Sequence, residues 1–552
     1  MLARCSGAAL VGLEAVEVAV EVDIAPGLPG LLMVGLADAA VQESRERVRA
    51  ALRNSGLRMP LTRVIVSLAP ADLRKEGPAF DLPIALAVLA ASGQLEPQRL
   101  AGIWCAGELG LDGSLRPVRG AMAVAMAARQ AGARALVLPA ANGAEAALVA
   151  GLSLVPAGSL LEVLHLLAEP DAGQGHERQG GQCQAGPDSG PRGPKAQPAA
   201  RAHPASRSPS AAATAPGPAA SDLDLADVQG QLHGRRALEI AAAGGHHLLL
   251  VGPPGSGKTM LARRLPALLP PLEDAEVLEL SCLYSVAGLL GTGGEPLRRR
   301  PFRAPHHSCS SAALVGGGSI PRPGELALAH RGVLFLDELA EFRRDVLNQL
   351  RQPLEEGEVW ISRARQRVRF PCTVSLVAAT NPCPCGWFGD PVRACRCGER
   401  LRSQYWGRLA GPLLDRLDLQ VVVRRLEASE LEAGELDGRG GSGGPSSRPE
   451  SSAVVATRVT AARRRMAARN PAGCGNGQLS GRALRQHLQA APDALELWRL
   501  AMDRRGLSAR AAERVLRVAR TIADLAGQGQ VDAGAVAEAL SYRSFDSEAA
   551  KA

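Results

Sequence analysis

The chain has 552 residues, of which 46% are hydrophobic, and a formal net charge of +8. This length exceeds what one hydrophobic core usually organises, so roughly two to four domains are expected. A run of about 18 apolar residues is absent and glutamates interrupt the N-terminal apolar stretch, so we expect a cytoplasmic protein without a membrane partner.

Residues 1–168 are predicted to form an α+β domain. Four valines between positions 16 and 22 alternate with other residues, as in a half-buried strand, and residues 39–54 have helical spacing. Residues 169–221 contain Pro, Gly, Ala and Ser with almost no large apolar side chain. They are expected to be a disordered linker that leaves the orientation of the flanking domains free.

Residues 222–433 are predicted to form an α/β core. The short apolar strands HHLLLVG, GVLFLDE, TVSLVAAT and LDLQVVV alternate with helical stretches, which is typical of a parallel sheet covered on both faces. Residues 434–452 are rich in Gly and Ser and predict a second flexible linker. Residues 453–545 have Ala, Arg and Leu at helical spacing and predict a helical lid.

A phosphate-binding loop lies between the strand HHLLLV and the expected helix MLARRLPAL, the context that makes the pattern GxxxxGK[ST] specific. Its glycines let backbone N–H groups turn toward phosphates, Lys258 neutralises the β and γ oxygens, and the Thr259 hydroxyl binds Mg²⁺. The predicted ATP ligands are Gly252, Pro253, Pro254, Gly255, Ser256, Gly257, Lys258 and Thr259.

Two carboxylates end the apolar strand GVLFLDE. Asp337 is predicted to hold Mg²⁺ together with Thr259, and Glu338 to polarise the attacking water. Such a pair could instead cap a helix. Asn381 follows the strand TVSLVAAT, where its amide can orient water near the γ-phosphate. ATP and Mg²⁺ are therefore the predicted cofactors.

The segment VWISRARQRVRF, residues 359–370, predicts a β-hairpin with Arg363, Arg365 and Arg367 near its tip. Upstream, residues 314–325 have the Gly and Pro content of a loop. Both segments could be ordinary solvated loops. The basic net charge of the chain would also suit contact with the phosphates of a polyanionic partner such as nucleic acid.

Four cysteines follow Asn381 as two CxC pairs: Cys383, Cys385, Cys395 and Cys397. Four thiolates at this spacing can surround a tetrahedral Zn²⁺, but four reduced thiols would give the same pattern. For His306 and His307, a role in stabilising a loop or an interface is favoured over metal binding, because no matching carboxylate accompanies them.

The longest motifs resemble the ComM/YifB family, the bacterial magnesium-chelatase-like AAA+ proteins. The segments that carry the resemblance are DVQGQLHGRRALEIAAAGGHHLLLVGPPGSGKTMLA, RPFRAPHHSCSSAALVGGGSIPRPGELALAHRGVLFLDELAEF, ATNPCPCG and GPLLDRLDL. The resemblance implies a P-loop AAA+ core with a helical lid, preceded by an α+β domain similar to that of Lon protease, of the ribosomal protein S5 domain 2-like fold. It also implies a ring, in this family a hexamer.

What such a ring acts on is also implied by the resemblance. The family points to branched or single-stranded DNA and to branch migration or helicase activity in recombination or natural transformation. The alternative is a chelatase-type chaperone that remodels a protein partner. The segments at 314–325 and 359–370 resemble pore-facing insertions of such rings. Two such insertions in a basic protein favour contact of Arg363, Arg365 and Arg367 with DNA phosphates over a role as solvated loops. Asn381 resembles the sensor 1 residue.

Further residues acquire roles only through this resemblance. Arg416 in LLDRLDL matches the arginine finger, and Arg510 in SARAAERVLRVARTIADL matches the sensor 2 arginine, although an exposed helix arginine would look the same. Ala79 and Met122 stand where Lon proteases carry the catalytic serine and lysine. Because neither side chain can act as nucleophile or base, we expect no peptidase activity.

Overall fold

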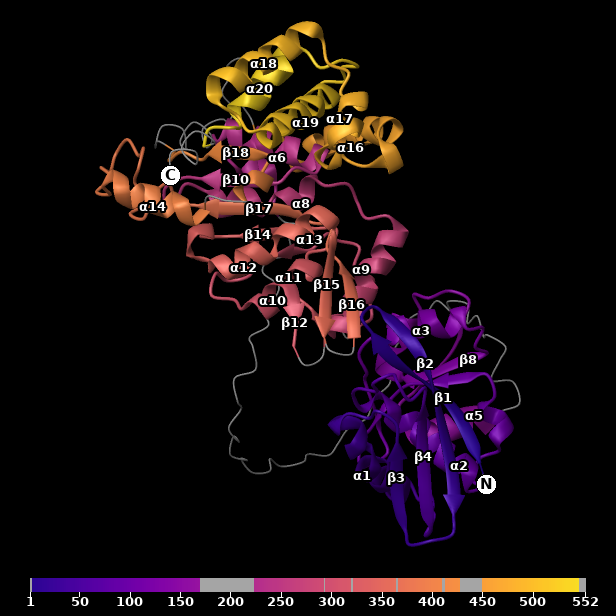
Figure 1. Ribbon diagram of the computed structural model, residues 1–552. Helices are drawn as coiled ribbons and strands as arrows, with labels where there is room; N and C mark the ends of the chain where they lie inside the picture. The colour runs from indigo at the N-terminus through magenta and orange to yellow at the C-terminus, as the bar shows by residue number, and fades with distance from the viewer. Residues whose placement is uncertain are drawn as a thin grey trace, which may run out of the picture.

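The computed structural model describes residues 2–168, 223–291, 293–318, 321–363, 366–409, 413–426 and 449–545. Figure 1 shows an N-terminal unit (indigo), a central sheet with its helices, and a group of C-terminal helices (yellow). The predicted linker at 169–221 and residues 434–448 of the second one lie outside the described residues. Within the described ranges, no helix is long and apolar enough to cross a membrane.

The N-terminal unit contains a seven-stranded mixed sheet with the order β3-β4-β2-β1-β5-β8-β9. Strand β2 is antiparallel to both of its neighbours, and the remaining pairs are parallel. The strands are β1 (Ala3–Val11), β2 (Glu14–Ala25), β3 (Gly30–Val34), β4 (Arg63–Ala69), β5 (Ile103–Cys105), β8 (Ala135–Pro139) and β9 (Ser153–Ala157). The predicted valine strand is β2, in which Val18, Val20 and Val22 are buried.

Helices cover both faces of this sheet because side chains alternate along each strand. In β8, Val137 belongs to a core cluster with helices α1 (Ala39–Asn54), α2 (Asp81–Ala91) and α5 (Leu160–Ala168). The next residue, Leu138, belongs to the opposite cluster, which includes α3 (Ala121–Gln130). Helix α1 coincides with the residues predicted for it.

The central sheet has five parallel strands with the order β11-β14-β17-β10-β18. The four predicted strands are β10 (Leu248–Val251), β14 (Val333–Leu336), β17 (Ser375–Thr380) and β18 (Leu419–Val422). The fifth, β11 (Phe302–Arg303), was not predicted. Leu248 and Leu250 pack toward α6 (Leu232–Gly244), whereas Leu249 and Val251 pack toward α9 (Asp274–Ala287).

The helix expected after the phosphate-binding loop is interrupted. It forms as α7 (Lys258–Ala262) and α8 (Leu265–Leu268), separated by a turn at Arg263 and Arg264. Pro266 has no N–H to donate to the carbonyl four residues earlier, and its ring crowds the preceding turn. The interrupted segment is thus a direct consequence of this proline.

The C-terminal helices pack on the α6 side of the central sheet (Figure 1). Helices α16 and α19 contact α6 and share one core cluster with the sheet. The group consists of α16 (Ser452–Arg469), α17 (Gly481–His487), α18 (Pro492–Arg505), α19 (Ala509–Leu525) and α20 (Ala533–Ser541).

The N-terminal unit docks directly on α9. The Gly120 N–H donates to the Ser285 carbonyl at 3.1 Å, and the Ser285 hydroxyl donates to Glu145 in α4 (Gly143–Ala146). Cys282 of α9 lies in the same apolar cluster as Met122 of α3. Buried contacts outside the predicted linker therefore join the N-terminal unit to the core, an arrangement that the sequence did not predict.

Candidate nucleotide-binding site

The loop of residues 252–259 joins β10 to α7, and its backbone needs glycine. Gly255 and Gly257 have φ values of +77° and +92°, in the left-handed region that favours glycine. A side chain at Gly252 would place its Cβ 2.1 Å from the Val423 carbonyl oxygen. Ser256 Oγ is buried and has no hydrogen-bond partner among the described residues. The loop therefore offers a compact polar cradle with one unsatisfied hydroxyl.

Lys258 lies across this cradle. Its Nζ donates to the carbonyl oxygens of Gly252 at 2.6 Å and Pro253 at 2.9 Å, and to Asn381 Oδ1 at 3.2 Å. Burial lowers the pKa of Lys258, while the carboxylates of Asp337 and Glu338 oppose this change. The ammonium thus connects the loop to the amide at the end of β17.

Asp337 and Glu338 follow β14, and Asn381 follows the neighbouring strand β17. These three polar residues therefore lie at the carboxyl edge of the sheet, where ligands of open parallel sheets bind. The Thr259 hydroxyl donates to Asp337 Oδ2 at 2.9 Å, so the two predicted Mg²⁺ ligands are adjacent. Glu338 precedes the 3-10 helix η6 (Leu339–Glu341) with left-handed backbone angles, and its side chain accepts no capping hydrogen bond. Its Oε2 lies 3.0 Å from His307 Nδ1.

These groups fit a nucleoside triphosphate with Mg²⁺. The loop leaves no room for a side chain at Gly252, and it presents an unsatisfied serine hydroxyl and a buried ammonium, which are donors that phosphates require. The Thr259 hydroxyl and the Asp337 carboxylate are oxygen ligands that a hard cation requires. The contact between His307 and Glu338 was missed by sequence reasoning. No local pattern in the sequence indicates it, because it depends on the course of the loop after β11.

Arg416 and Arg510 lie in different surroundings. Arg416 ends the short 3-10 helix η7 (Leu414–Arg416), and its Nη2 lies 2.5 Å from Glu355 Oε1 of α13 (Arg351–Glu356). Arg510 is exposed in the first turn of α19. One turn later, Arg514 is buried with its Nε 3.3 Å from Asp418 Oδ1. Sequence reasoning missed Arg514, although its spacing from Arg510 places both on one side of the helix.

The predicted hairpin forms from β15 (Glu358–Arg363) and β16 (Gln366–Pro371). Its buried face, which includes Val359 and Phe370, belongs to the core cluster on the α9 face of the sheet. On the other face, the Arg367 guanidinium carbon lies 4.3 Å from the ring centroid of Trp360, which is 43% exposed. Arg365 and the side chain of Arg363 lie outside the described part of the chain.

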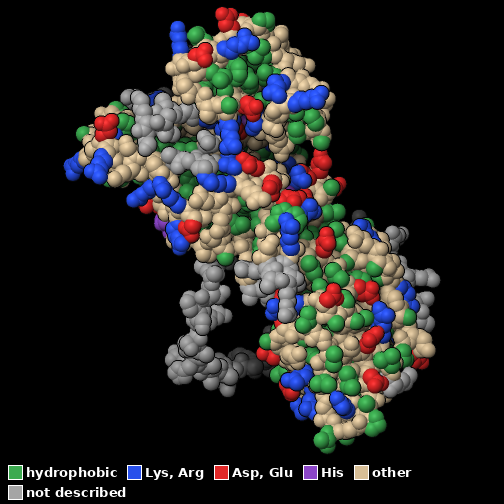
Figure 2. All heavy atoms as spheres, viewed as in Figure 1, with side chains coloured by type: hydrophobic (Ala, Val, Ile, Leu, Met, Phe, Trp, Pro, Cys, Tyr) green, Lys and Arg blue, Asp and Glu red, His purple; other side chains and the backbone are tan. Residues whose placement is uncertain are grey.

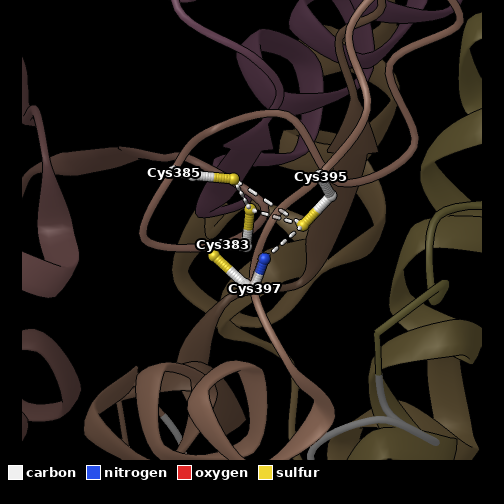
Figure 3. A group of neighbouring side chains, drawn as sticks. All are labelled: Cys383, Cys385, Cys395 and Cys397. Carbon is white, nitrogen blue, oxygen red and sulfur yellow. Dashed lines mark hydrogen bonds between the residues drawn. The ribbon is translucent and has the colours of Figure 1, made fainter.

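The four cysteines gather in the loop between β17 and α14 (Glu399–Leu409), as Figure 3 shows. Their sulfur atoms all lie within 4.8 Å of one another. This compact arrangement matches the donor set of a tetrahedral zinc site better than four unrelated thiols. Gly386, inside the loop, lies against Pro254, to which an added Cβ would come within 2.8 Å. Lys and Arg side chains are among those exposed in the region of the adjoining α14 (Figure 2).

The positions that correspond to a Lon catalytic pair have no catalytic side chains. Ala79 lies in the 3-10 helix η1 (Pro78–Phe80), where its carbonyl accepts from Gly107 N. Met122 is fully buried in α3, and its N–H donates to Glu145 Oε1 at 3.1 Å. Met122 is therefore enclosed at the contact with α9.

Comparisons with known proteins agree with this architecture. Family models match three parts of the chain: magnesium chelatase subunit ChlI at 224–431, subunit ChlI of Mg-chelatase at 20–142, and the ChlI C-terminal region at 449–543. The chain is also 31% identical over 150 residues to Lon protease 2 of Bacillus subtilis, covering 25% of this chain and 26% of that protein.

Full-length relatives cover nearly the whole chain. An uncharacterized protein of Mycobacterium tuberculosis is 44% identical, over 98% of each chain. Competence protein ComM of Haemophilus influenzae is 41% identical, over 97% of this chain and 96% of its own. The uncharacterized protein YifB of Escherichia coli is 40% identical, over 98% and 96%. The chain belongs to the ComM/YifB family of magnesium-chelatase-like AAA+ ATPases.

Proposed function

We propose that this ATPase is a ring motor, a hexamer, that moves branched or single-stranded DNA by branch migration or helicase-type unwinding in recombination or natural transformation. The observation that carries the proposal is the exposed face of the β15–β16 hairpin. There a guanidinium stacks on an exposed indole, the combination that binds nucleic-acid phosphates and bases without reading sequence. The name of the competence protein ComM supports a role in DNA handling.

Each residue of the nucleotide site has a proposed role. Lys258 and the backbone of residues 252–259 bind the phosphates, and Thr259 and Asp337 hold Mg²⁺, which supplies charge neutralisation. Glu338 accepts a proton from the attacking water, which Asn381 orients. Arg416 acts on the site of the neighbouring subunit as arginine finger, and Arg510 acts as sensor 2. The functional units are residues 1–168, 222–433 and 453–545.

Zn²⁺ is proposed as a structural cofactor of the cysteine loop. Its ligands are Cys383, Cys385, Cys395 and Cys397, whose sulfur atoms are already gathered. The loop begins two residues after Asn381 and touches Pro254 through Gly386. A bound metal would therefore stiffen the segment beside the nucleotide site.

The test combines strand displacement on forked and four-way DNA with ATPase rates measured with and without that DNA. The parent is expected to unwind DNA with Mg-ATP and to hydrolyse ATP faster when DNA is present. Arg367→Ala should lose most of both responses and keep basal hydrolysis. Arg343→Ala, which removes an exposed arginine already paired with Asp345 at 2.8 Å, should behave like the parent.

Two outcomes would contradict the proposal. DNA that leaves the ATPase rate unchanged and remains base-paired would favour the chelatase-type chaperone acting on a protein partner. Equal losses for Arg367→Ala and Arg343→Ala would show that general surface charge, and not the hairpin, binds DNA.

A further inference from the structure

The C-terminal end of the chain holds the segment that follows Arg416. Arg543 is only 4% exposed, and its Nη1 donates to the carbonyl oxygens of Leu417 at 2.7 Å and Asp418 at 3.4 Å. Gln420 N in β18 donates to the Tyr542 carbonyl at 2.8 Å. Residues 542–545 therefore lie along β18, next to the turn that carries Arg416.

The side chain of Asp418 is held by one residue of the C-terminal helices and by one residue of the core. Its Oδ1 lies 3.3 Å from Arg514 Nε of α19, and its Oδ2 lies 3.0 Å from His246 Nδ1. Burial opposes ionisation of this carboxyl, but the hydrogen bond from His246 and the charge of Arg514 outweigh it and lower its pKa to about 2. Asp418 thus remains an anion that ties this segment to α19 throughout the neutral range.

Residues 542–545 also contact two further parts of the core. The Tyr542 ring stacks on His233 of α6, with centroids 4.5 Å apart, and Phe545 stacks on Trp406 of α14, with centroids 5.0 Å apart. Trp406 Nε1 donates to the Pro382 carbonyl at 3.1 Å, directly after Asn381. Residues 542–545 are thus anchored on both sides of β18.

We propose that Arg543 is a positioning residue for Arg416, through which the C-terminal helices set where the finger lies relative to the neighbouring subunit's nucleotide. This inference rests on the proposed role of Arg416. Arg543 binds the backbone of the two residues after the finger, so its loss frees the η7 turn without removing a group from the subunit's own nucleotide site. A displacement of about 1 Å at a catalytic group can cost on the order of 10²-fold in rate.

Mixed rings separate the two roles of a subunit. Subunits with Glu338→Gln cannot hydrolyse but can donate Arg416, and subunits with Arg416→Ala can hydrolyse only when a neighbour donates it. Hydrolysis in a mixture of the two therefore reports donation alone. Adding Arg543→Gln to the donor should lower this rate about tenfold or more, whereas adding it to the acceptor should leave the rate unchanged.

Controls make the result specific. Arg505→Gln removes another arginine–carbonyl bond of the C-terminal domain, to Leu540 at 3.0 Å, and should be neutral in both subunits. Arg543→Lys, which keeps the charge but not the planar fork, should show a smaller loss confined to the donor. It replaces Arg543→Gln if that variant does not fold. Ring assembly is followed by mass photometry in every mixture.

The outcomes distinguish failure of the Arg543 positioning role from failure of the finger role of Arg416, on which it rests. If rings of Arg416→Ala subunits alone hydrolyse ATP at the parent rate, the finger assignment itself fails. If those rings are inactive but Arg543→Gln donors are as effective as unmodified donors, the positioning role is wrong. Equal losses in donor and acceptor would also overturn it, because they indicate a general structural defect.

Discussion

At the scale of single residues, the nucleotide site separates binding from hydrolysis. Lys258 bridges two loop carbonyls and Asn381, so its ammonium stands at the centre of the cradle. Glu338 lies at the edge, paired with His307. In the proposed roles, a change at Lys258 removes charge that phosphates need for binding, whereas a change at Glu338 affects only the activation of water.

We expect Lys258→Ala to lose nucleotide binding, and Glu338→Gln to retain binding but hydrolyse about 10²–10⁴-fold more slowly, the usual contribution of a general base. Binding is measured with a fluorescent ATP analogue and hydrolysis by phosphate release. Glu341→Gln, which neutralises an exposed carboxylate three residues later, serves as control. Similar binding losses in Lys258→Ala and Glu338→Gln would contradict the assigned roles.

The sequence predicted these residues because each follows a recognisable strand or loop. Asp337 and Asn381 come directly after β14 and β17, which are parallel neighbours in the sheet. Both residues are therefore expected at the same edge of the sheet. The pairing of His307 with Glu338 could not be predicted. It depends on the course of the loop after β11, which no local pattern determines.

At the scale of elements, the cysteine loop gives a direct metal test. We expect roughly one zinc per chain, lost when Cys395 and Cys397 are both replaced by serine, since two remaining thiolates cannot complete a tetrahedral site. Elemental analysis of the purified protein measures the zinc content per chain. Replacing Cys309 and Cys474, which lie outside the cluster, should leave the metal content unchanged. A metal-free parent with an unchanged melting temperature in the double variant would exclude the site.

The hairpin gives a prediction about salt. Replacing Arg365 and Arg367 by alanine should weaken DNA binding and reduce the slope of log K against log salt by about 0.7 to 0.9 for each lost phosphate contact. Fluorescence anisotropy at several salt concentrations measures this slope on two unrelated sequences. Sizing chromatography checks the alternative that these arginines pair with a neighbouring subunit. A double variant with the parent's slope and normal unwinding would exclude the hairpin as the DNA contact.

The elements that the sequence predicted are those with strong local signals. The hairpin formed with the expected alternation, and four of the five core strands are mainly apolar runs, two of which, β14 and β17, are followed directly by a polar residue. Strand β11 has only two residues and no periodicity to detect. The break between α7 and α8 could have been predicted from Pro266, because an interior proline disrupts a helix.

At the scale of the whole molecule, the docking of the N-terminal unit could not be predicted. Its polar contacts include those among Gly120, Glu145 and Ser285 and that of Cys282 Sγ with the Leu13 carbonyl. They join residues that are far apart in the sequence. The composition of residues 169–221 indicates a linker but says nothing about contacts between the domains it joins. Met122, at the position that resembles the Lon lysine, lies in the same apolar cluster as Cys282 of α9.

This docking predicts a specific effect of Ser285→Ala. The change removes the hydroxyl that α9 donates across the interface and leaves Glu145 buried with fewer donors, which costs about 1–3 kcal/mol. Hydrogen exchange should therefore rise on both sides of the interface, at residues 120–122 and 285–288.

Ser281→Ala is the matched control, because Ser281 lies one turn earlier and accepts from Leu297 N within the core. Its effect should be confined to the core. If Ser285→Ala leaves residues 120–122 as protected as in the parent, this hydrogen bond does not hold the domains together. The docking then rests on the remaining contacts, which include the Gly120–Ser285 backbone hydrogen bond, the contact of Cys282 Sγ with the Leu13 carbonyl at 3.6 Å and the apolar packing of Cys282 with α3.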